Sequence, residues 1–221
     1  MIQRHPEPEL MDDVPEVEAY GNADFSEVNQ AFVERLLNLA GQHHAVRALD
    51  LGTGPGDIPI RLVLARPKWH IVAVDASEPM LHLAREASKR NKVYTPIQWL
   101  KVDAKDTKLP PHSFDVLLSN TLLHHINNVT KFWAEVKHLA RPGATILFRD
   151  LSRPVDDEAI RNIVERYAGQ ESSLLQEEYR RSLAASYTPD EVRSQLEEAG
   201  LNMLEVTMVT DRHLDIFGNM R

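Results

Sequence analysis

Polar residues stand at the ends of several short apolar segments in this sequence. They are four aspartates and one asparagine: Asp50, Asp75, Asp103, Asn120 and Asp150. A short apolar segment of this kind predicts a buried strand, and ligands of open parallel sheets bind beyond the carboxyl ends of the strands. Carboxylates at these positions can accept hydrogen bonds from hydroxyl, amino and ammonium groups. The sequence therefore predicts one binding site that is assembled from strand ends.

A glycine-rich segment, LDLGTGPGD, contains the first of these aspartates. Gly52, Gly54 and Gly56 occupy every second position, and glycine lets the backbone approach a ligand closely because it has no Cβ. A dinucleotide-binding loop has the order G-x-G-x-x-G. Here Asp57 replaces its third glycine and would repel a pyrophosphate at the start of the following helix. The segment also lacks the Gly-Lys-Ser/Thr ending of a P-loop, so it suits a ligand without a phosphate.

Two adjacent histidines follow the fourth apolar segment. Imidazole titrates near neutral pH, so His124 or His125 could act as a general base or orient a second substrate. The alternative is that either histidine packs on the sheet at the start of a helix. Asp150 could anchor an amine or a hydroxyl, or form a structural salt bridge with Arg149 or Arg153. The sequence shows no obvious cluster of metal ligands, so we expect no metal site.

The elements that must position these residues alternate between helix and strand. Apolar residues at helical spacing predict helices over 24–40 and 57–65, and further helices are expected from Ser77 onward and over 129–140. The expected strands are 46–51, 71–74, 97–102, 114–119 and 145–149. This alternation predicts an α/β fold, in which a doubly wound, mostly parallel sheet is covered by helices on both faces.

The alternation changes after the fifth strand. Apolar residues at helical spacing predict a helical insert over 152–187, placed where it could cap a pocket. Thr188 and Glu191 have the spacing of a capping box and predict the start of a helix that ends at Gly200. The remaining expected elements are a turn at 141–143 and two strands at 203–210 and 213–217.

Five segments taken together resemble the class I S-adenosylmethionine (SAM)-dependent methyltransferases. The resemblance covers about residues 20–150, and the segments follow the order and spacing of that family. They are Asp50–Gly56, Val72–Asp75 with Ala76-Ser77 and Met80-Leu81 after it, Val102–Ala104, Phe114–Asn120 and Leu139–Ala144. The resemblance implies a Rossmann-like, seven-stranded sheet with an antiparallel last strand. It also implies SAM as the cofactor, which carries no phosphate.

The resemblance further implies roles for individual residues. Gly52, Thr53, Gly54 and Gly56 would lie along the methionine part of SAM, and Asp50 would orient this loop or meet the ammonium group. The other implied contacts are Tyr20 near the sulfonium, Asp75 at the ribose hydroxyls, Ala76, Met80 and Asn120 beside the cofactor, and Asp103 with Ala104 at the adenine. Methyl transfer is an in-line displacement, so the enzyme mainly holds the acceptor and the methyl group in line.

Composition narrows the range of partners. The chain has 221 residues, a formal net charge of −8 and no cysteine. Without cysteine there is no disulfide, thiolate nucleophile or cysteine-bound metal, which fits a reducing cytoplasm. The basic residues form no stripe, so a nucleic-acid partner is not expected. No apolar run approaches the ~20 residues that span a bilayer, so membrane insertion is not expected.

We expect a single domain over 1–221. Within it, 1–19 is expected as a flexible lead-in, 20–41 as an N-terminal helical lid and 152–187 as a helical substrate cap. A pocket closed in this way favours a small-molecule acceptor that is methylated on oxygen, nitrogen or carbon. The alternatives are a protein or RNA methyltransferase and a non-catalytic SAM-binding regulatory subunit. The sequence leaves the acceptor and the oligomeric state open.

Overall fold

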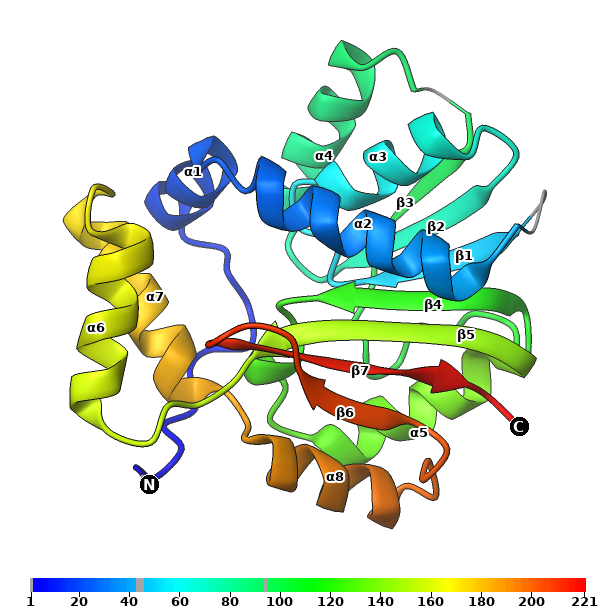
Figure 1. Cartoon of the computed structure of the whole chain (residues 1–221). Coiled ribbons are helices and arrows are strands. Elements are labelled where there is room, and N and C mark those ends of the chain that lie inside the picture. The colour runs from blue at the N-terminus through cyan, green and yellow to red at the C-terminus, as the bar shows by residue number, and fades with distance from the viewer. Residues whose placement is uncertain (1, 43–45, 94) are drawn as a thin grey trace.

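A seven-stranded sheet forms the centre of the computed structural model, which describes residues 2–42, 46–93 and 95–221 (Figure 1). The strands are β1 (Arg47–Leu51), β2 (His70–Asp75), β3 (Ile97–Lys101), β4 (Phe114–Asn120), β5 (Ala140–Leu151), β6 (Glu205–Met208) and β7 (His213–Asn219). Their order in the sheet is β3-β2-β1-β4-β5-β7-β6. Strands β1 to β5 pair in parallel, and β7 is antiparallel to both of its neighbours. The predicted mostly parallel sheet with an antiparallel last strand is confirmed.

Helices cover both faces of the sheet, as predicted. They are α1 (Val14–Asn22), α2 (Ser26–Ala40), α3 (Asp57–Ala65), α4 (Glu78–Arg90), the 3₁₀ helix η1 (Leu123–His125), α5 (Val129–Leu139), α6 (Asp157–Ala168), α7 (Ser173–Ala185) and α8 (Pro189–Glu198). Leu36 of α2 and Leu62 of α3 belong to the core on one face, and Trp133 of α5 belongs to the core on the other. Successive strand residues point to opposite faces, so Ala48 packs in the first core and Leu49 in the second. In the described part of the chain, no helix is long and apolar enough to cross a membrane.

Side-chain caps determine where the helices next to the site begin. Ser77 Oγ accepts a hydrogen bond from the backbone N–H of Met80 (3.3 Å) at the start of α4. Thr188 and Glu191 form the predicted capping box of α8, with reciprocal contacts of 3.3 and 2.8 Å. Each cap satisfies a backbone N–H that has no partner within its helix. The local sequence therefore fixes these starting points without help from distant residues.

The N-terminal helices differ from the expected lead-in and lid. Helix α1 covers Val14–Asn22, and α2 begins only at Ser26. The expected lead-in at 1–19 therefore contains most of a helix, and the expected lid at 20–41 is divided between two. Among the described side chains of α1, Val17 is the buried one. One buried apolar residue among acidic neighbours produces no helical periodicity that sequence inspection could recognise.

The segment before α1 lies against the rest of the chain rather than loose in solvent. Residues 2–13, named here the N-terminal strap, run between α7 and the edge of the sheet (Figure 1). The backbone N–H of His5 donates to the carbonyl of Ala184 (3.0 Å). The guanidinium of Arg4 donates to the carbonyl of His124 (2.8 Å). The strap therefore crosses the carboxyl edge of the sheet, where the ligand site is expected.

The fifth and sixth strands also differ from their predicted bounds. Strand β5 includes the expected turn at 141–143, because the pairing with β4 shifts register between Phe114 and Val116. The extra residues of β5 take up this irregularity, and Gly143 adopts a positive φ of 83°. Strand β6 is shorter than the predicted 203–210, since it lies at the sheet edge and pairs with β7 alone.

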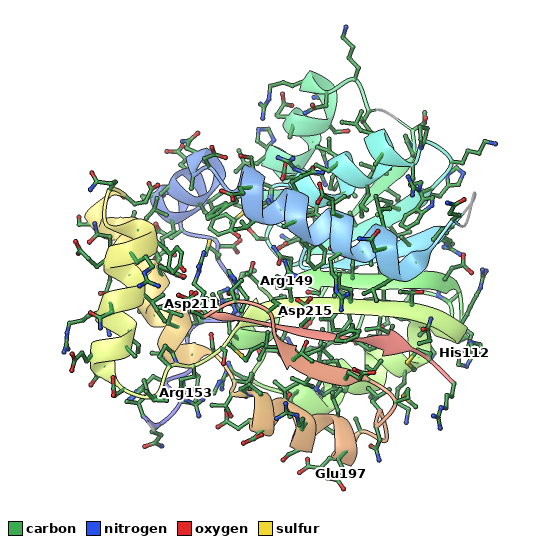
Figure 2. The ribbon with its side chains drawn as sticks, in the orientation of Figure 1. His112, Arg149, Arg153, Glu197, Asp211 and Asp215 are labelled. Carbon is green, nitrogen blue, oxygen red and sulfur yellow. The ribbon has the colours of Figure 1, made fainter. Side chains whose placement is uncertain are left out.

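A buried ion pair joins β5 to β7. The guanidinium of Arg149 donates to both carboxylate oxygens of Asp215, at 2.7 and 3.0 Å, and Asp215 is 0% exposed. Figure 2 shows the two labelled residues on these neighbouring strands. A bidentate pair of this kind has a fixed geometry. It holds the antiparallel strand in register beside the strand that carries Asp150.

Candidate active site

The carboxyl ends of the parallel strands meet at one edge of the sheet. In the strand register, Asp50 of β1 lies beside Ala73 of β2 and Leu118 of β4. Asn120 of β4 lies beside Arg149 of β5. The structure therefore brings the predicted residues at the ends of β1, β2, β4 and β5 to one place. The segment with Asp103 follows β3, at the outer side of the same edge.

Asp50 and Thr53 supply polar atoms that no described residue satisfies. Asp50 is 2% exposed and Thr53 is 8% exposed. Asp50 Oδ2 and Thr53 Oγ1 are buried without a hydrogen-bond partner in the described part of the chain. Burial raises the pKa of Asp50 to about 7; the nearby Thr53 hydroxyl opposes this rise, and the negative charge of Asp75 adds to it. Buried polar groups normally have partners, so these two atoms mark the place where a polar ligand would bind.

The three glycines of the loop after β1 have different surroundings. Gly52, Gly54 and Gly56 all have positive φ values, of 70°, 54° and 82°. A Cβ on Gly52 would lie 2.7 Å from Leu122, and a Cβ on Gly56 would lie 2.6 Å from Trp99. A Cβ on Gly54 would meet no described atom within 4 Å. The loop is thus packed on both sides, and open space lies in front of Gly54.

Asp75 ties this loop to the start of α4. Its Oδ2 accepts a hydrogen bond from the backbone N–H of Gly54, and its Oδ1 accepts one from that of Ser77, both at 2.8 Å. Burial raises the pKa of the Asp75 carboxyl, although these backbone hydrogen bonds act in the opposite direction. The backbone N–H of Ala76 also donates to this carboxylate, and the remaining lone-pair capacity is available to a ligand. The neighbouring Ala76 is exposed, and Met80 is buried in the first turn of α4.

The predicted adenine-side residues lie beside the N-terminal strap. Asp103 Oδ1 is 3.0 Å from Lys105 Nζ, and Lys105 Nζ is 3.0 Å from Glu9 Oε2. Glu9 Oε1 also accepts a hydrogen bond from the backbone N–H of Asn127 (2.7 Å). Ala104 is buried at 8% exposure. Glu9 therefore links the strap both to the loop after β3 and to the segment after η1.

Asp150 pairs with His124 rather than with an arginine. Asp150 Oδ1 lies 2.5 Å from His124 Nδ1, and Asp150 Oδ2 accepts a hydrogen bond from the backbone N–H of His124 (3.2 Å). Both side chains are nearly inaccessible, at 4% and 3% exposure. The two arginines bind other carboxylates: Arg149 binds Asp215 and Arg153 binds Glu191. The expected salt bridge between Asp150 and an arginine is wrong, because each guanidinium finds its carboxylate on another element.

Glu7 of the N-terminal strap completes this cluster and has no counterpart in the predicted site. Glu7 Oε1 lies 3.4 Å from Nε2 of His124 and 3.2 Å from Nδ1 of His125. It also accepts a hydrogen bond from Ser182 Oγ of α7 (3.1 Å). The three ligand atoms of Glu7, His124 and His125 all lie within 4.8 Å of one another. Glu7 is far from the two histidines in the sequence, so inspection of the sequence shows no such group.

The titration of this cluster reflects burial and mutual charge. Burial opposes the charged form of His124, but the negative charges of Asp150 and Glu7 outweigh it, so the pKa of His124 is raised. Burial and the neighbouring His124 lower the pKa of His125 to about 3. Burial raises the pKa of Glu7. The two adjacent histidines therefore differ: His125 is neutral at physiological pH, and His124 is stabilised as a cation in the ligand-free structure.

Tyr20 and Asn120 flank the space between these groups. Tyr20 lies near the end of α1, and its ring centroid is 4.9 Å from that of Phe25. Burial raises the pKa of Tyr20, an effect that a hydrogen bond with Thr121 opposes and the charges of Asp75 and Asp150 reinforce. Thr121 itself has a positive φ of 57°, and such strain concentrates at functional sites. The Asn120 amide donates to Asn29 Oδ1 of α2 (3.4 Å) and links β4 to that helix.

Sequence comparison identifies a family for the central part of the chain. Residues 49–148 match the family described as a methyltransferase domain. An uncharacterised methyltransferase of Mycobacterium bovis is 34% identical over 98 residues, which are 44% of this chain and 47% of that protein. A malonyl-[acyl-carrier protein] O-methyltransferase of Xylella fastidiosa is 32% identical over 121 residues, which are 55% of this chain and 40% of that protein. The matches thus span about half the length of these curated relatives.

Solved structures share the fold over most of the chain. A SAM-dependent methyltransferase from Aquifex aeolicus superposes with a TM-score of 0.70 at 20% identity, over 96% of this chain and all of that one. A phosphoethanolamine N-methyltransferase of Haemonchus contortus, solved with S-adenosylhomocysteine, superposes with a TM-score of 0.68 at 17% identity, over 89% of this chain and 52% of that one. At these identities the likeness concerns the fold. Residues 49–148 therefore form a methyltransferase domain, and the chain around them has the fold of the class I SAM-dependent methyltransferases.

Proposed function

We propose that the protein transfers the methyl group of SAM to a small-molecule acceptor that binds beside His124. The observation that carries the proposal is that two groups of residues lie at the same edge of the sheet. One is the loop after β1, with its unsatisfied Asp50 and Thr53 atoms. The other is the buried pair of His124 and Asp150. The first suits a polar cofactor without a phosphate, and the second suits activation of a nucleophile.

The residues of the loop fit the parts of SAM. The carboxylate of Asp50 would bind the ammonium group, and the Thr53 hydroxyl would bind the carboxylate end, because both groups lack partners in the described part of the chain. The open space in front of Gly54 would hold the methionine chain. The free lone pairs of Asp75 would accept hydrogen bonds from the ribose hydroxyls. The sulfonium would then lie below Tyr20.

At the other end of the cofactor, the proposed adenine contacts are Asp103 and Ala104. The carboxylate of Asp103 would accept a hydrogen bond from the adenine amino group, and the backbone of Ala104 would meet the ring. Ala76 and Met80 would line the ribose side, and Asn120 the side of β4. The negative charge of Asp50 and Asp75 at this edge favours a ligand with a cationic centre.

His124 is the proposed activating group for the acceptor. Asp150 accepts the hydrogen bond from Nδ1–H, so Nε2 faces Glu7 Oε1 at 3.4 Å, and its lone pair becomes available once the imidazolium has released its second proton. Methyl transfer needs this group only when the acceptor must become more nucleophilic. Two relatives bear on the acceptor: the X. fastidiosa protein is named an O-methyltransferase, and a protein of Dinoroseobacter shibae, 24% identical over 126 residues, is named a C-methyltransferase of ubiquinone/menaquinone biosynthesis. Both names support an oxygen or an activated carbon as the methylated atom.

Helices α1, α6 and α7 are the proposed lid and cap. Helix α1 contacts both α4 and α7, and the α6–α7 pair stands beyond the carboxyl end of the sheet (Figure 1). Ser182 of α7 reaches the strap residue Glu7 next to the histidines. Such a cover encloses a small acceptor and excludes water from the methyl group. A cover of this kind would favour a small molecule over a folded macromolecule as the acceptor.

Calorimetry and a labelled-cofactor screen test this function. We expect the protein to bind S-adenosylhomocysteine with one-to-one stoichiometry and not to bind NAD. Incubation with methyl-labelled SAM and a metabolite extract should yield a labelled small molecule, and His124→Asn should abolish the label without preventing S-adenosylhomocysteine binding. Label found only in protein or RNA would contradict the small-molecule acceptor. Cofactor binding without transfer to any fraction would favour a non-catalytic SAM-binding subunit.

A further inference from the structure

The cluster at Glu7 has the composition of a metal site. It combines two imidazole nitrogens and one carboxylate oxygen, all within 4.8 Å of one another. The side chains are largely withdrawn from water, with exposures of 7% for Glu7, 4% for His124 and 17% for His125. Two histidines and one glutamate are a recurring ligand set of zinc sites that keep an open position. The cluster therefore offers a complete set of three protein ligands.

Two of the three distances between the ligand atoms are close to the geometry of such a site. Zinc binds nitrogen and oxygen ligands at about 2.0–2.2 Å, which places neighbouring ligands of a tetrahedron about 3.3–3.6 Å apart. Glu7 Oε1 lies 3.4 Å from His124 Nε2 and 3.2 Å from His125 Nδ1. The histidine rings are tilted by 36°, with centroids 4.2 Å apart. The two imidazole nitrogens lie within 4.8 Å of each other, and His125 Nδ1 also lies 3.3 Å from the Pro8 carbonyl, so a bound cation would displace this carbonyl and turn the rings toward Glu7.

Asp150 supplies the outer contact that metal-bound histidines need. A histidine that binds a metal through one nitrogen almost always donates its other N–H to a carboxylate or carbonyl oxygen. Asp150 accepts this hydrogen bond from His124 Nδ1 at 2.5 Å. A metal ion that binds Nε2 would replace the second proton of the imidazolium, on the side where Glu7 Oε1 lies 3.4 Å away. On the opposite side, Ser182 Oγ donates to Glu7 Oε1 and orients the carboxylate.

A cation would also resolve the charge of this buried cluster. Oxygen Oε1 of Glu7 is approached by two imidazole nitrogens and one hydroxyl. A buried carboxylate is costly unless it is paired or coordinates a metal. We propose that Glu7, His124 and His125 bind one divalent cation of the zinc class, and that the remaining coordination position takes an oxygen atom of the methyl acceptor. The acceptor class is then a hydroxyl compound.

The part of this inference that concerns the acceptor rests on the proposed function. A bound cation lowers the pKa of a coordinated hydroxyl, so the acceptor would bind as its oxyanion and release a proton to solvent. This oxygen would attack the methyl carbon of SAM. The carbon–sulfur bond would break as the carbon–oxygen bond forms, and its electron pair would remain on sulfur as S-adenosylhomocysteine leaves. His124 would thus activate the acceptor through the cation.

Metal binding by the full chain tests the site independently of methyl transfer. Protein treated with a chelator and then freed of it is titrated with Zn²⁺ by calorimetry, and with Co²⁺ by visible absorption. We expect one ion per chain, with Co²⁺ bands of the intensity typical of four-coordinate sites. Glu7→Gln and His125→Asn should each weaken Zn²⁺ binding at least tenfold. Asp12→Asn, which changes an exposed carboxylate of the same strap, should leave Zn²⁺ binding unchanged.

The failure of this inference can be distinguished from failure of the proposed function. Absence of stoichiometric Zn²⁺ binding to the wild-type chain, or equal affinity in Glu7→Gln, overturns the metal site. S-adenosylhomocysteine affinity, measured on every variant, should remain as in the wild type and shows that the variants are folded. If Zn²⁺ binds as expected but chelation leaves methyl transfer unchanged, the role of the cation at the acceptor is overturned. If Zn²⁺ binds and S-adenosylhomocysteine does not, the proposed function fails and the metal site stands.

Discussion

The carboxylate of Asp150 contacts His124 twice, through the imidazole Nδ1 at 2.5 Å and through the backbone N–H at 3.2 Å. Asp150 comes from β5, and His124 from the 3₁₀ helix after β4. The Asp150 side chain thus holds both the imidazole ring and the backbone of His124, which lies in the segment after the neighbouring strand β4. This relationship makes His124 a positioned group and gives Asp150 a role that a lone strand-end carboxylate would not have.

Asp150→Asn should therefore impair catalysis and not cofactor binding. The asparagine keeps the shape but cannot provide the negative charge that holds His124 Nδ1–H, so Nε2 loses its orientation. We expect kcat/KM to fall roughly 10²-fold or more, as is typical when a positioned acid–base group is lost. The measurement is the rate of S-adenosylhomocysteine formation with the acceptor found by the labelled screen. S-adenosylhomocysteine affinity should stay as in the wild type.

A matched control for this variant is Asp106→Asn. Asp106 is an exposed carboxylate whose partner is the exposed Lys108, so its loss should change neither the rate nor the melting temperature noticeably. An unchanged kcat/KM in Asp150→Asn would show that the His124–Asp150 pair is structural and not part of the site.

Asp50→Asn should stabilise the ligand-free protein at pH 8 and weaken SAM binding. Burial raises the pKa of Asp50 from 3.8 to about 7. Between these pH values the folded chain binds the proton that the unfolded chain has lost, so the free energy of unfolding falls as the pH rises from about 4 to 7. Above pH 7 the penalty is complete, and a shift of this size corresponds to at most about 4 kcal/mol. Asparagine has no such penalty.

Thermal unfolding at several pH values checks this prediction. The melting temperature of Asp50→Asn should exceed that of the wild type at pH 8, and the difference should vanish near pH 4. Calorimetry at pH 8 should show SAM affinity reduced at least tenfold, because the ammonium loses its carboxylate. For the wild type, SAM affinity should rise with pH through about 7. A wild type that is more stable than the variant at pH 8 would show that another group neutralises Asp50.

Alanine substitutions at two neighbouring glycines should separate binding from folding. Gly54→Ala places a Cβ in the open space of the proposed cofactor site, so we expect S-adenosylhomocysteine binding to be lost. The free energy of unfolding should fall only by the left-handed backbone strain, about 1–2 kcal/mol. Gly56→Ala adds contacts of 2.6 Å with Trp99 and 2.8 Å with Ala84. Overpacking adds about 1–3 kcal/mol to the same strain.

Urea unfolding and calorimetry on both variants measure the two effects. The free energy of unfolding should fall more in Gly56→Ala than in Gly54→Ala, and cofactor affinity should fall more in Gly54→Ala. Full cofactor affinity in Gly54→Ala would mean that the methionine chain of SAM does not lie in front of this residue.

Local sequence predicted the placement of Asp50, Asp75 and the loop glycines at one edge of the sheet because each of them lies at or directly after the end of a strand. Asp50, Asp75 and the glycines are placed by the bounds of β1 and β2, which a few apolar residues determine. Glu7 could not be found in this way, since it lies 117 positions before the first of the two histidines in an acidic segment without periodicity. Its position depends on contacts of the strap with η1 and α7. These are tertiary contacts between segments far apart in the chain, and no local sequence pattern indicates them.

The same distinction explains the role of Asp150. The sequence placed this residue correctly at the end of the fifth strand, but it offered Arg149 and Arg153 as partners because they are near in the chain. In a strand, adjacent side chains point to opposite faces, so the side chains of Arg149 and Asp150 do not meet each other. Arg149 instead meets Asp215 of β7, a strand whose place beside β5 follows from the family resemblance and not from local residues.

The pair of Arg149 and Asp215 provides the last prediction, because its loss should be strongly non-additive. Asp215 is 0% exposed, and Arg149 covers both of its oxygens. Removing one partner leaves a buried charge alone, which costs about 3–5 kcal/mol. Arg149→Met and Asp215→Leu should therefore each lower the free energy of unfolding by about this amount. The double variant should lose much less free energy of unfolding than the sum of the two single losses, since apolar residues of similar volume can replace a buried pair.

Urea unfolding of the wild type, the two single variants and the double variant completes the double-mutant cycle. Additive losses would show that the two charges do not depend on each other. The guanidinium of Arg35 also lies 3.7 Å from Asp215. Because Arg149→Met leaves this cation near Asp215, it should lower the free energy of unfolding less than Asp215→Leu does.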